Sequence, residues 1–116
     1  MVTYNHEKYI AESIYSILSQ TFQDFELIIV DDGSTDNTLK VIKSFLDERI
    51  AVYYQENSGT SSACNFAISK TQSEYVSLVS GDDCATPDRL KIQYEYFLQH
   101  SEATILFGKC RIIDEW

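Results

Sequence analysis

Two pairs of adjacent aspartates are the residues of this chain best suited to chemistry. Asp31 and Asp32 follow an apolar run, and Asp82 and Asp83 follow a β-prone run that ends in a serine and a glycine. In an open parallel sheet, ligands bind in the crevice beyond the carboxyl ends of the strands. Carboxylate oxygens are also ligands that Mg²⁺ and Mn²⁺ prefer. The sequence therefore predicts that the two acidic strand ends share one site, where a cation and a phosphate meet.

Each acidic pair also has a simpler interpretation, because aspartate is common in turns and near helix N-termini. The repetition of the pattern at two strand ends favours a site. Two like charges 4 Å apart repel by roughly 4 kcal/mol at an effective dielectric constant near 20. A divalent cation would relieve this repulsion and could bridge the carboxylates to a phosphate, with water completing its shell. We therefore expect a divalent cation, Mn²⁺ or Mg²⁺, as the cofactor.

Runs of apolar and β-branched residues predict the strands that must position these aspartates. The run at residues 27–30 is unbroken, and such a run indicates burial on both faces, as in a parallel sheet. The predicted strands cover residues 1–4, 25–30, 50–54, 75–79, 103–107 and 110–113.

Apolar residues at spacings of three and four predict helices between the strands. Asn5 is expected to cap the first helix and Ser34 or Thr35 the second, while Thr86 and Pro87 begin the last. The predicted inner faces are Ile10, Ile14, Ile17 and Leu18; Leu39, Ile42, Phe45 and Leu46; Ala63, Ala67 and Ile68; and Leu90, Tyr94, Phe97 and Leu98. This alternation predicts an α/β fold, a mainly parallel sheet flanked by helices, in a single domain over residues 1–116.

The net charge, the apolar runs and the cysteines of the chain limit which binding partners and which cellular compartment are expected. The net charge is −9, from 18 acidic and 9 basic residues, which argues against nucleic acid or anionic lipid as a partner. No apolar run approaches the roughly 18 residues of a membrane span. Cys64, Cys84 and Cys110 are widely spaced and form no CxxC pair, which fits a reducing, cytoplasmic compartment and gives no support to a zinc site.

The ordered set of motifs resembles the family-2 glycosyltransferases. The resemblance covers essentially the whole chain and implies the GT-A fold, a Rossmann-like nucleotide-binding sheet. The motifs that carry it are Thr3-Tyr4-Asn5, Ser19-Gln20-Thr21-Phe22, the stretch from Phe25 through Asp31-Asp32-Gly33-Ser34-Thr35-Asp36, Asn57-Ser58-Gly59, Gly81-Asp82-Asp83 and Pro87-Asp88-Arg89-Leu90.

The resemblance implies roles for matching residues. Those expected to contact the nucleotide are Thr3, Tyr4, Asp31, Asp32 and Asp82. Of the first acidic pair, Asp32 is favoured as the contact to the base, and Asp82 is expected nearer the ribose. Asp83 would be the metal ligand for the diphosphate of a sugar nucleotide. The metal would stabilise the charge that builds on the departing diphosphate.

The family also implies the reaction. It is an inverting transfer of sugar to the hydroxyl of a glycan or lipid-linked acceptor, in polysaccharide or cell-surface glycan synthesis, with a carboxylate as the base. We expect that base beyond Trp116, so the catalytic residue is unassigned and the chain is the N-terminal, donor-binding part of a C-terminally truncated domain. The full-length protein is expected in the cytoplasm or at the inner face of the membrane, and a homo-oligomer is an open alternative.

Two other classes of function remain open from the sequence. A phosphoacceptor receiver domain also has an acidic pair, with a lysine on a later strand that Lys109 could supply. That pair belongs after the first strand of a receiver, however, whereas Asp31 and Asp32 follow the second predicted strand. The other alternative is a module that binds a nucleotide or a protein without chemistry. His6 is interpreted as a solvated loop histidine.

Overall fold

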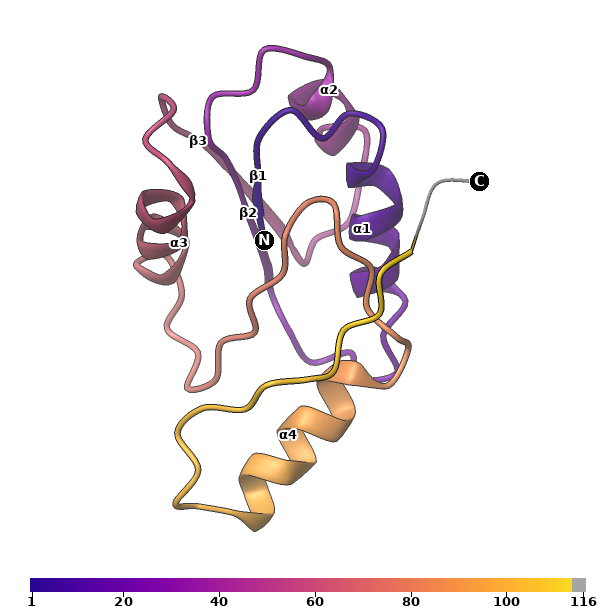
Figure 1. The fold of residues 1–116 in the computed structure, drawn as a ribbon, viewed down its shortest axis with the longest axis vertical. Helices are drawn as coiled ribbons and strands as arrows, with labels where there is room; N and C mark the ends of the chain where they lie inside the picture. The colour runs from indigo at the N-terminus through magenta and orange to yellow at the C-terminus, as the bar shows by residue number, and fades with distance from the viewer. Residues whose placement is uncertain (114–116) are drawn as a thin grey trace.

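The computed structural model describes residues 1–113 and places a parallel sheet at the centre of the chain (Figure 1). Its strands are β1 (Val2–Thr3), β2 (Leu27–Asp31) and β3 (Ile50–Tyr54), in the order β1-β2-β3. Both neighbouring pairs are parallel, with Thr3 opposite Asp31 and Asp31 opposite Tyr54. The predicted fold class is confirmed.

Helices cover both faces of this sheet. In Figure 1, α1 (Ile10–Leu18) and α2 (Thr38–Ile42) lie on one side of the strands, and α3 (Thr60–Ile68) lies on the other. Side chains of β2 alternate between the two faces, as successive residues of a strand must. Leu27 and Ile29 join the core formed with α1 and α2, whereas Ile28 and Val30 pack with α3. All five residues of β2 are buried, so the predicted burial on both faces is confirmed.

The predicted strand at residues 75–79 is wrong. The chain there contacts the sheet through one isolated bridge, between Val2 and Ser80. The amide of Val2 donates to the Val79 carbonyl at 3.2 Å, and the amide of Gly81 donates to the Val2 carbonyl at 2.9 Å. The reason is the shortness of β1, which has only two residues to offer as a partner.

The strands predicted at residues 103–107 and 110–113 are also wrong. Within the part of the chain that the structure describes, neither segment is paired as a strand. Both follow α4 (Arg89–Gln99) and leave large apolar side chains open to solvent, including Phe107 and Ile112, each 88% exposed. Without a neighbouring strand to supply backbone hydrogen bonds, β propensity alone does not form a ladder.

The predicted caps of α1 and α2 also need correction. Asn5 does not cap α1; it adopts a left-handed backbone with φ of 55°, and its side-chain oxygen accepts a hydrogen bond from the Thr35 amide. The residue that precedes α1 is Tyr9, and the one that precedes α2 is Asn37, rather than Ser34 or Thr35. The two predicted caps are used instead to join their loops, as described below.

Two of the predicted inner faces differ from the structure, one because α2 is short and one because α4 has no buried residue. Helix α2 ends at Ile42, so Leu46 falls beyond it and is 98% exposed. Helix α4 begins at Arg89, after the predicted start at Thr86, and every one of its residues is at least partly exposed, with Leu98 61% exposed. No helix within residues 1–113 has both the length and the apolar content to cross a membrane.

Ile42 and Leu46 provide a matched test of this core, because the sequence predicts both on one buried face. Ile42 is fully buried, whereas Leu46 lies in solvent. We expect Ile42→Ala to lower the free energy of unfolding by about 2–5 kcal/mol through the cavity that it leaves. Leu46→Ala should stay within about 0.5 kcal/mol of the wild type. Urea unfolding followed by circular dichroism measures both, and equal losses would contradict the observed end of α2.

Candidate functional site

The carboxyl ends of the strands bring the predicted site residues to one edge of the sheet. Thr3 lies opposite Asp31 in the parallel register, and the bridge from Val2 to Ser80 places the following turn on the other side of β1. The spatial order is therefore residue 80, β1, β2 and β3, all running in the same direction, and the order in which the chain adds segments to the sheet reverses at β1. In such sheets the crevice beyond this switch is where ligands bind.

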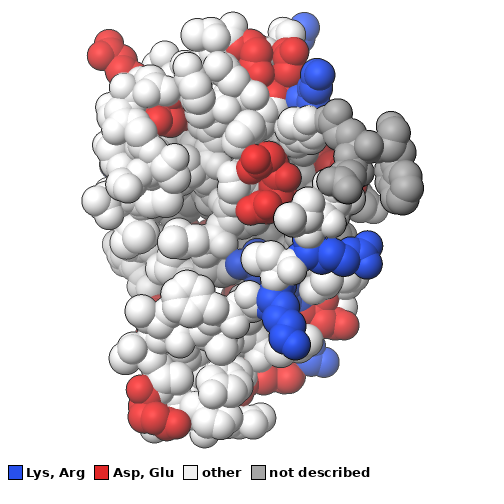
Figure 2. Space-filling view, in the orientation of Figure 1, with Lys and Arg blue, Asp and Glu red and all other residues white. Residues whose placement is uncertain are grey.

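Gly81 allows the second acidic turn to lie directly against β1. A Cβ atom at this position would lie 2.5 Å from Thr3 Oγ1 and 2.9 Å from His6 Nδ1. Those distances are below van der Waals contact, so a side chain would push the turn away. Figure 2 shows acidic side chains in the middle of this face, over the turn that Figure 1 draws beside β1.

Asp82 is exposed but held from two sides. The Ser80 hydroxyl donates a hydrogen bond to Asp82 Oδ1, and His6 Nε2 lies 3.8 Å from Asp82 Oδ2. The Ser80 hydrogen bond, with a smaller contribution from His6, lowers the pKa of Asp82, although partial desolvation acts in the opposite direction. The carboxylate is therefore negatively charged at neutral pH and restricted in orientation.

Asp83 is held through its backbone and leaves its carboxylate available. Its amide donates to the Ser80 carbonyl at 3.2 Å, and its carbonyl accepts a hydrogen bond from the Ser13 hydroxyl. The side chain is exposed, and within residues 1–113 its carboxylate accepts no hydrogen bond. An exposed, unengaged carboxylate fits a divalent cation that draws its remaining ligands from water and phosphate.

Asp32 has the opposite environment, because it is only 3% exposed and its carboxylate accepts three hydrogen bonds from the loop after β3. Its Oδ1 accepts hydrogen bonds from Gln55 Nε2 at 2.6 Å and the Ser58 amide at 3.0 Å. Its Oδ2 accepts one from the Gly59 amide at 2.9 Å. Asp32 therefore fixes the loop over residues 55–59, and sequence reasoning missed these partners since nothing in their spacing indicates the contact.

Asp31 is fully buried beside it. Its Oδ1 accepts a hydrogen bond from the Ser34 amide at 3.0 Å, which closes the turn after β2. Its Oδ2 is buried and has no hydrogen-bond partner among the described residues. An unpaired buried acceptor is costly, and one small donor such as water would satisfy it.

The two acidic pairs lie along one edge of the sheet, as predicted, but they do not form one cluster of carboxylates. Within residues 1–113, no group of three or more His, Cys, Asp or Glu side chains could hold a metal ion. The physical reason is that hydrogen bonds hold Asp31 to the turn after β2 and Asp32 to the loop after β3. A cation at this edge would have to rely on Asp83 and on oxygens of its ligand.

Thr3, Tyr4 and His6 form the β1 side of the crevice. Thr3 is 1% exposed, and its carbonyl accepts a hydrogen bond from the Asp32 amide at 2.9 Å. Tyr4 is 44% exposed and is free to present its ring to a ligand. The prediction that His6 is a solvated loop residue is wrong, because its Nδ1 lies 3.2 Å from Thr3 Oγ1 and its other ring nitrogen faces Asp82. The partner comes from a distant part of the chain, so no local signal could have revealed it.

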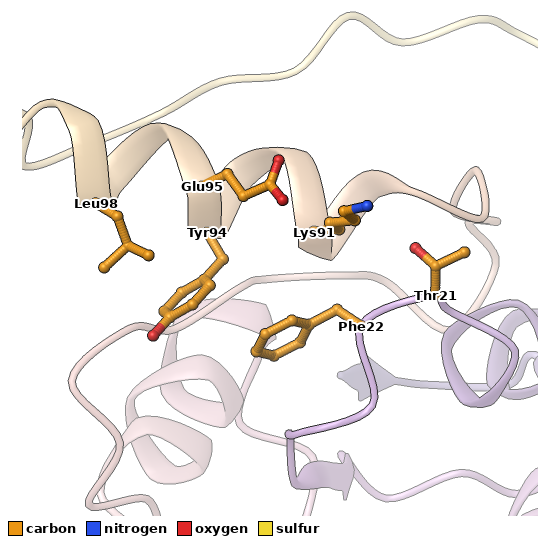
Figure 3. A pocket seen from close by; sticks show the side chains of 6 residues that line it. All are labelled: Thr21, Phe22, Lys91, Tyr94, Glu95 and Leu98. Carbon is orange, nitrogen blue, oxygen red and sulfur yellow. The ribbon is translucent and has the colours of Figure 1, made fainter.

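Two hollows lie on other parts of the surface. One has a volume of about 380 Å³ and lies between α4 and the segment after α1, where the rings of Phe22 and Tyr94 are 5.0 Å apart (Figure 3). The other, of about 310 Å³, is lined by residues that include Tyr75 and Phe97. Neither shares a lining residue with the acidic edge, so neither is part of this candidate site.

Comparison with known proteins gives a consistent result. The model of the family described as "Glycosyl transferase family 2" matches residues 1–115. The glycosyltransferase GlyG of Streptococcus pneumoniae is 37% identical over 115 residues, which are 97% of this chain and 38% of that protein. TuaG of Bacillus subtilis, whose assigned role is teichuronic acid biosynthesis, is 39% identical over 109 residues, 91% of this chain and 43% of TuaG. The chain thus spans about two fifths of the length of these relatives.

A solved structure shows the same fold. The crystal structure of S. aureus TarS 1-349 in complex with UDP-GlcNAc superposes with a TM-score of 0.80 and 32% sequence identity. The match covers 86% of this chain and 30% of that one. At this level of similarity the overall fold is shared.

Gly81 and Gly108 allow the close approach of the acidic turn to be tested. Gly81→Ala should lower the free energy of unfolding by about 1–3 kcal/mol, because the new methyl group meets the buried Thr3 side chain. Gly108→Ala is the control, since nothing lies within 4 Å of its Cβ position, and it should change stability by less than about 0.5 kcal/mol. Denaturant melts of the two variants decide the matter. A harmless Gly81→Ala would show that the turn does not pack on β1 as described.

Proposed function

The chain belongs to glycosyl transferase family 2, and we propose that it binds the sugar nucleotide donor of an enzyme that transfers the sugar to an acceptor hydroxyl. The observation that carries this proposal is the acidic turn at residues 82–83, which lies at the switch point of a nucleotide-binding type of sheet. The complex of TarS with UDP-GlcNAc supports a uridine nucleotide as the first donor to test. Because the chain spans about two fifths of its relatives, the transfer itself belongs to the whole protein.

The nucleotide would lie across the β1 end of the crevice. Tyr4 offers an exposed aromatic face on which a base can stack. Asp32 uses three of the roughly four lone-pair positions of its carboxylate on the loop over residues 55–59. One position is left for a ring N–H of the base, so Asp32 would contact the base and also hold the loop beside it. Asp82 would accept a hydrogen bond from the ribose.

Asp83 would hold the divalent cation, Mn²⁺ or Mg²⁺. Bound there with the diphosphate, the cation would supply Lewis-acid stabilisation of the leaving group. What the chain itself contributes is placement: Ser13 and Ser80 fix the Asp83 backbone, so the carboxylate projects from a rigid turn. The single available carboxylate suits an ion that arrives with the nucleotide.

The rest of the reaction is proposed from the family. We propose inversion at the anomeric carbon and a glycan or lipid-linked acceptor in polysaccharide synthesis, which the role assigned to TuaG supports. The base expected beyond Trp116 lies outside the described residues. A receiver-type signalling domain is less consistent with the structure, because Lys109 lies on an exposed segment and not on a strand.

Metal dependence tests the donor site. We expect UDP to bind in the presence of Mn²⁺ and to lose measurable affinity in EDTA, because a bare diphosphate would meet the carboxylates of Asp82 and Asp83. Asp83→Asn should weaken binding by about tenfold or more, and by more than Asp31→Asn does. Asp24→Asn, at an exposed residue away from the site, is the control. Isothermal titration calorimetry measures all four proteins, and equal affinity in EDTA and Mn²⁺ would contradict the cation site.

The stereochemistry of transfer tests the proposed reaction. In a full-length protein that contains this chain, the product should carry the anomeric configuration opposite to that of the donor, since direct attack by the acceptor hydroxyl inverts the centre. Proton NMR of the glycoside product reports the configuration from the coupling constant of its anomeric proton. A product with retained configuration would exclude direct displacement.

A further inference from the structure

We propose that His6 is a positioning residue, which restricts the Asp82 carboxylate where the turn at residues 80–83 lies against β1. This inference rests on the proposed donor site. The imidazole ring lies between β1 and the turn at residues 80–83. Its Nδ1 lies 3.2 Å from Thr3 Oγ1 and its Nε2 lies 3.8 Å from Asp82 Oδ2. The His6 side chain is only 23% exposed, whereas that of Asp82 is 46% exposed.

The backbone of His6 is fixed by a set of hydrogen bonds between residues 5–7 and residues 34–38, which we call the loop bridge. Each residue of the first segment donates its amide proton to a side chain of the second, and side chains of the first accept amide protons in return. The bonds are Asn5 N to Ser34 Oγ (2.9 Å), His6 N to Thr38 Oγ1 (2.8 Å), Glu7 N to Asp36 Oδ2 (3.1 Å), Thr35 N to Asn5 Oδ1 (2.8 Å) and Asn37 N to Glu7 Oε2 (2.8 Å).

The loop bridge accounts for the unusual backbone at Asn5. A φ of 55° places this residue in the left-handed region, which is uncommon for residues with a side chain but tolerated by asparagine. That conformation turns the chain so that His6 points back toward β1. Because every amide of residues 5–7 is engaged, the backbone that carries the His6 ring is held in place.

The ring itself is held by packing. A Cβ atom on Gly81 would lie 2.9 Å from His6 Nδ1, so the ring and the glycine backbone are in close contact. The buried Thr3 hydroxyl lies against the same nitrogen. When that hydroxyl donates to Nδ1, the neutral imidazole carries its proton on Nε2, and an N–H group faces the Asp82 carboxylate.

The consequence for donor binding is that Asp82 is oriented before the nucleotide arrives. Ser80 holds one carboxylate oxygen from within the same turn, and His6 approaches the other from the opposite wall. A side chain that is already ordered costs less entropy when it forms its ligand contact. The nucleotide would meet a carboxylate already set for the ribose, next to the cation carboxylate of Asp83.

Two substitutions of His6 test the contacts of its two ring nitrogens separately. In His6→Asn the amide nitrogen takes the place of Nδ1 and can still meet Thr3, but it cannot reach Asp82. In His6→Gln the amide nitrogen takes the place of Nε2 and can still face Asp82. His100→Asn is the matched control, because His100 ends α4 and its Nδ1 lies 2.9 Å from the Tyr96 carbonyl.

Calorimetric titration of UDP with Mn²⁺ into each protein gives the test, with thermal melts alongside to confirm folding. We expect His6→Asn to weaken UDP binding about threefold to tenfold, the range of the free-energy cost of ordering one side chain on binding. His6→Gln and His100→Asn should stay within about twofold of the wild type. Equal loss in His6→Asn and His6→Gln, or no loss in either, would overturn the positioning role. Failure of the wild-type chain to bind UDP would instead overturn the proposed donor site on which this role rests.

Discussion

The backbone hydrogen bonds of β1 are the interaction on which this structure depends. The strand has two residues, yet it is bonded on both sides. On one side the Val30 and Asp32 amides donate to the carbonyls of Met1 and Thr3, and on the other Val2 exchanges bonds with Val79 and Gly81. These bonds set the two acidic pairs on opposite sides of Thr3. The acidic edge forms because one short strand joins two segments that are far apart in the sequence.

Much of the fold follows from local patterns, and the errors follow from their limits. The unbroken apolar run of β2 predicted burial on both faces, and α1 and α3 supply the two layers that bury it. Leu46 shows why a periodic pattern is not sufficient, because the helix that would have turned it inward ends at Ile42. Residues 75–79 have the composition of a strand, but a ladder needs a partner of equal length and β1 does not provide one.

The location of the candidate site could be predicted from the sequence. Which of its carboxylates are buried and hydrogen-bonded, and which are exposed, could not. Strand ends in a parallel sheet must meet at one edge, so the positions of Asp31, Asp32, Asp82 and Asp83 could be anticipated from the sequence. Which carboxylates are buried could not, since that depends on loops that fold over them. The Asp32 carboxylate accepts hydrogen bonds from Gln55, Ser58 and Gly59. These bonds depend on the tertiary placement of a segment whose sequence is that of an ordinary polar loop. The contact between His6 and Asp82 is of the same kind.

The different environments of the four aspartates also reduce the electrostatic repulsion that their sequence positions imply. Four carboxylates gathered in one cluster would repel each other strongly and would need a cation simply to coexist. In this fold Asp31 accepts a hydrogen bond from the turn after β2, and amide donors of the loop after β3 stabilise the charge of Asp32. Of these four aspartates, only Asp82 and Asp83 face solvent. The Ser80 hydroxyl and the nearby His6 ring stabilise the negative charge of Asp82. This arrangement reduces the repulsion among the four carboxylates, and under the proposed function a cation would be required when a second set of negative charges, the diphosphate of a nucleotide, approaches Asp83.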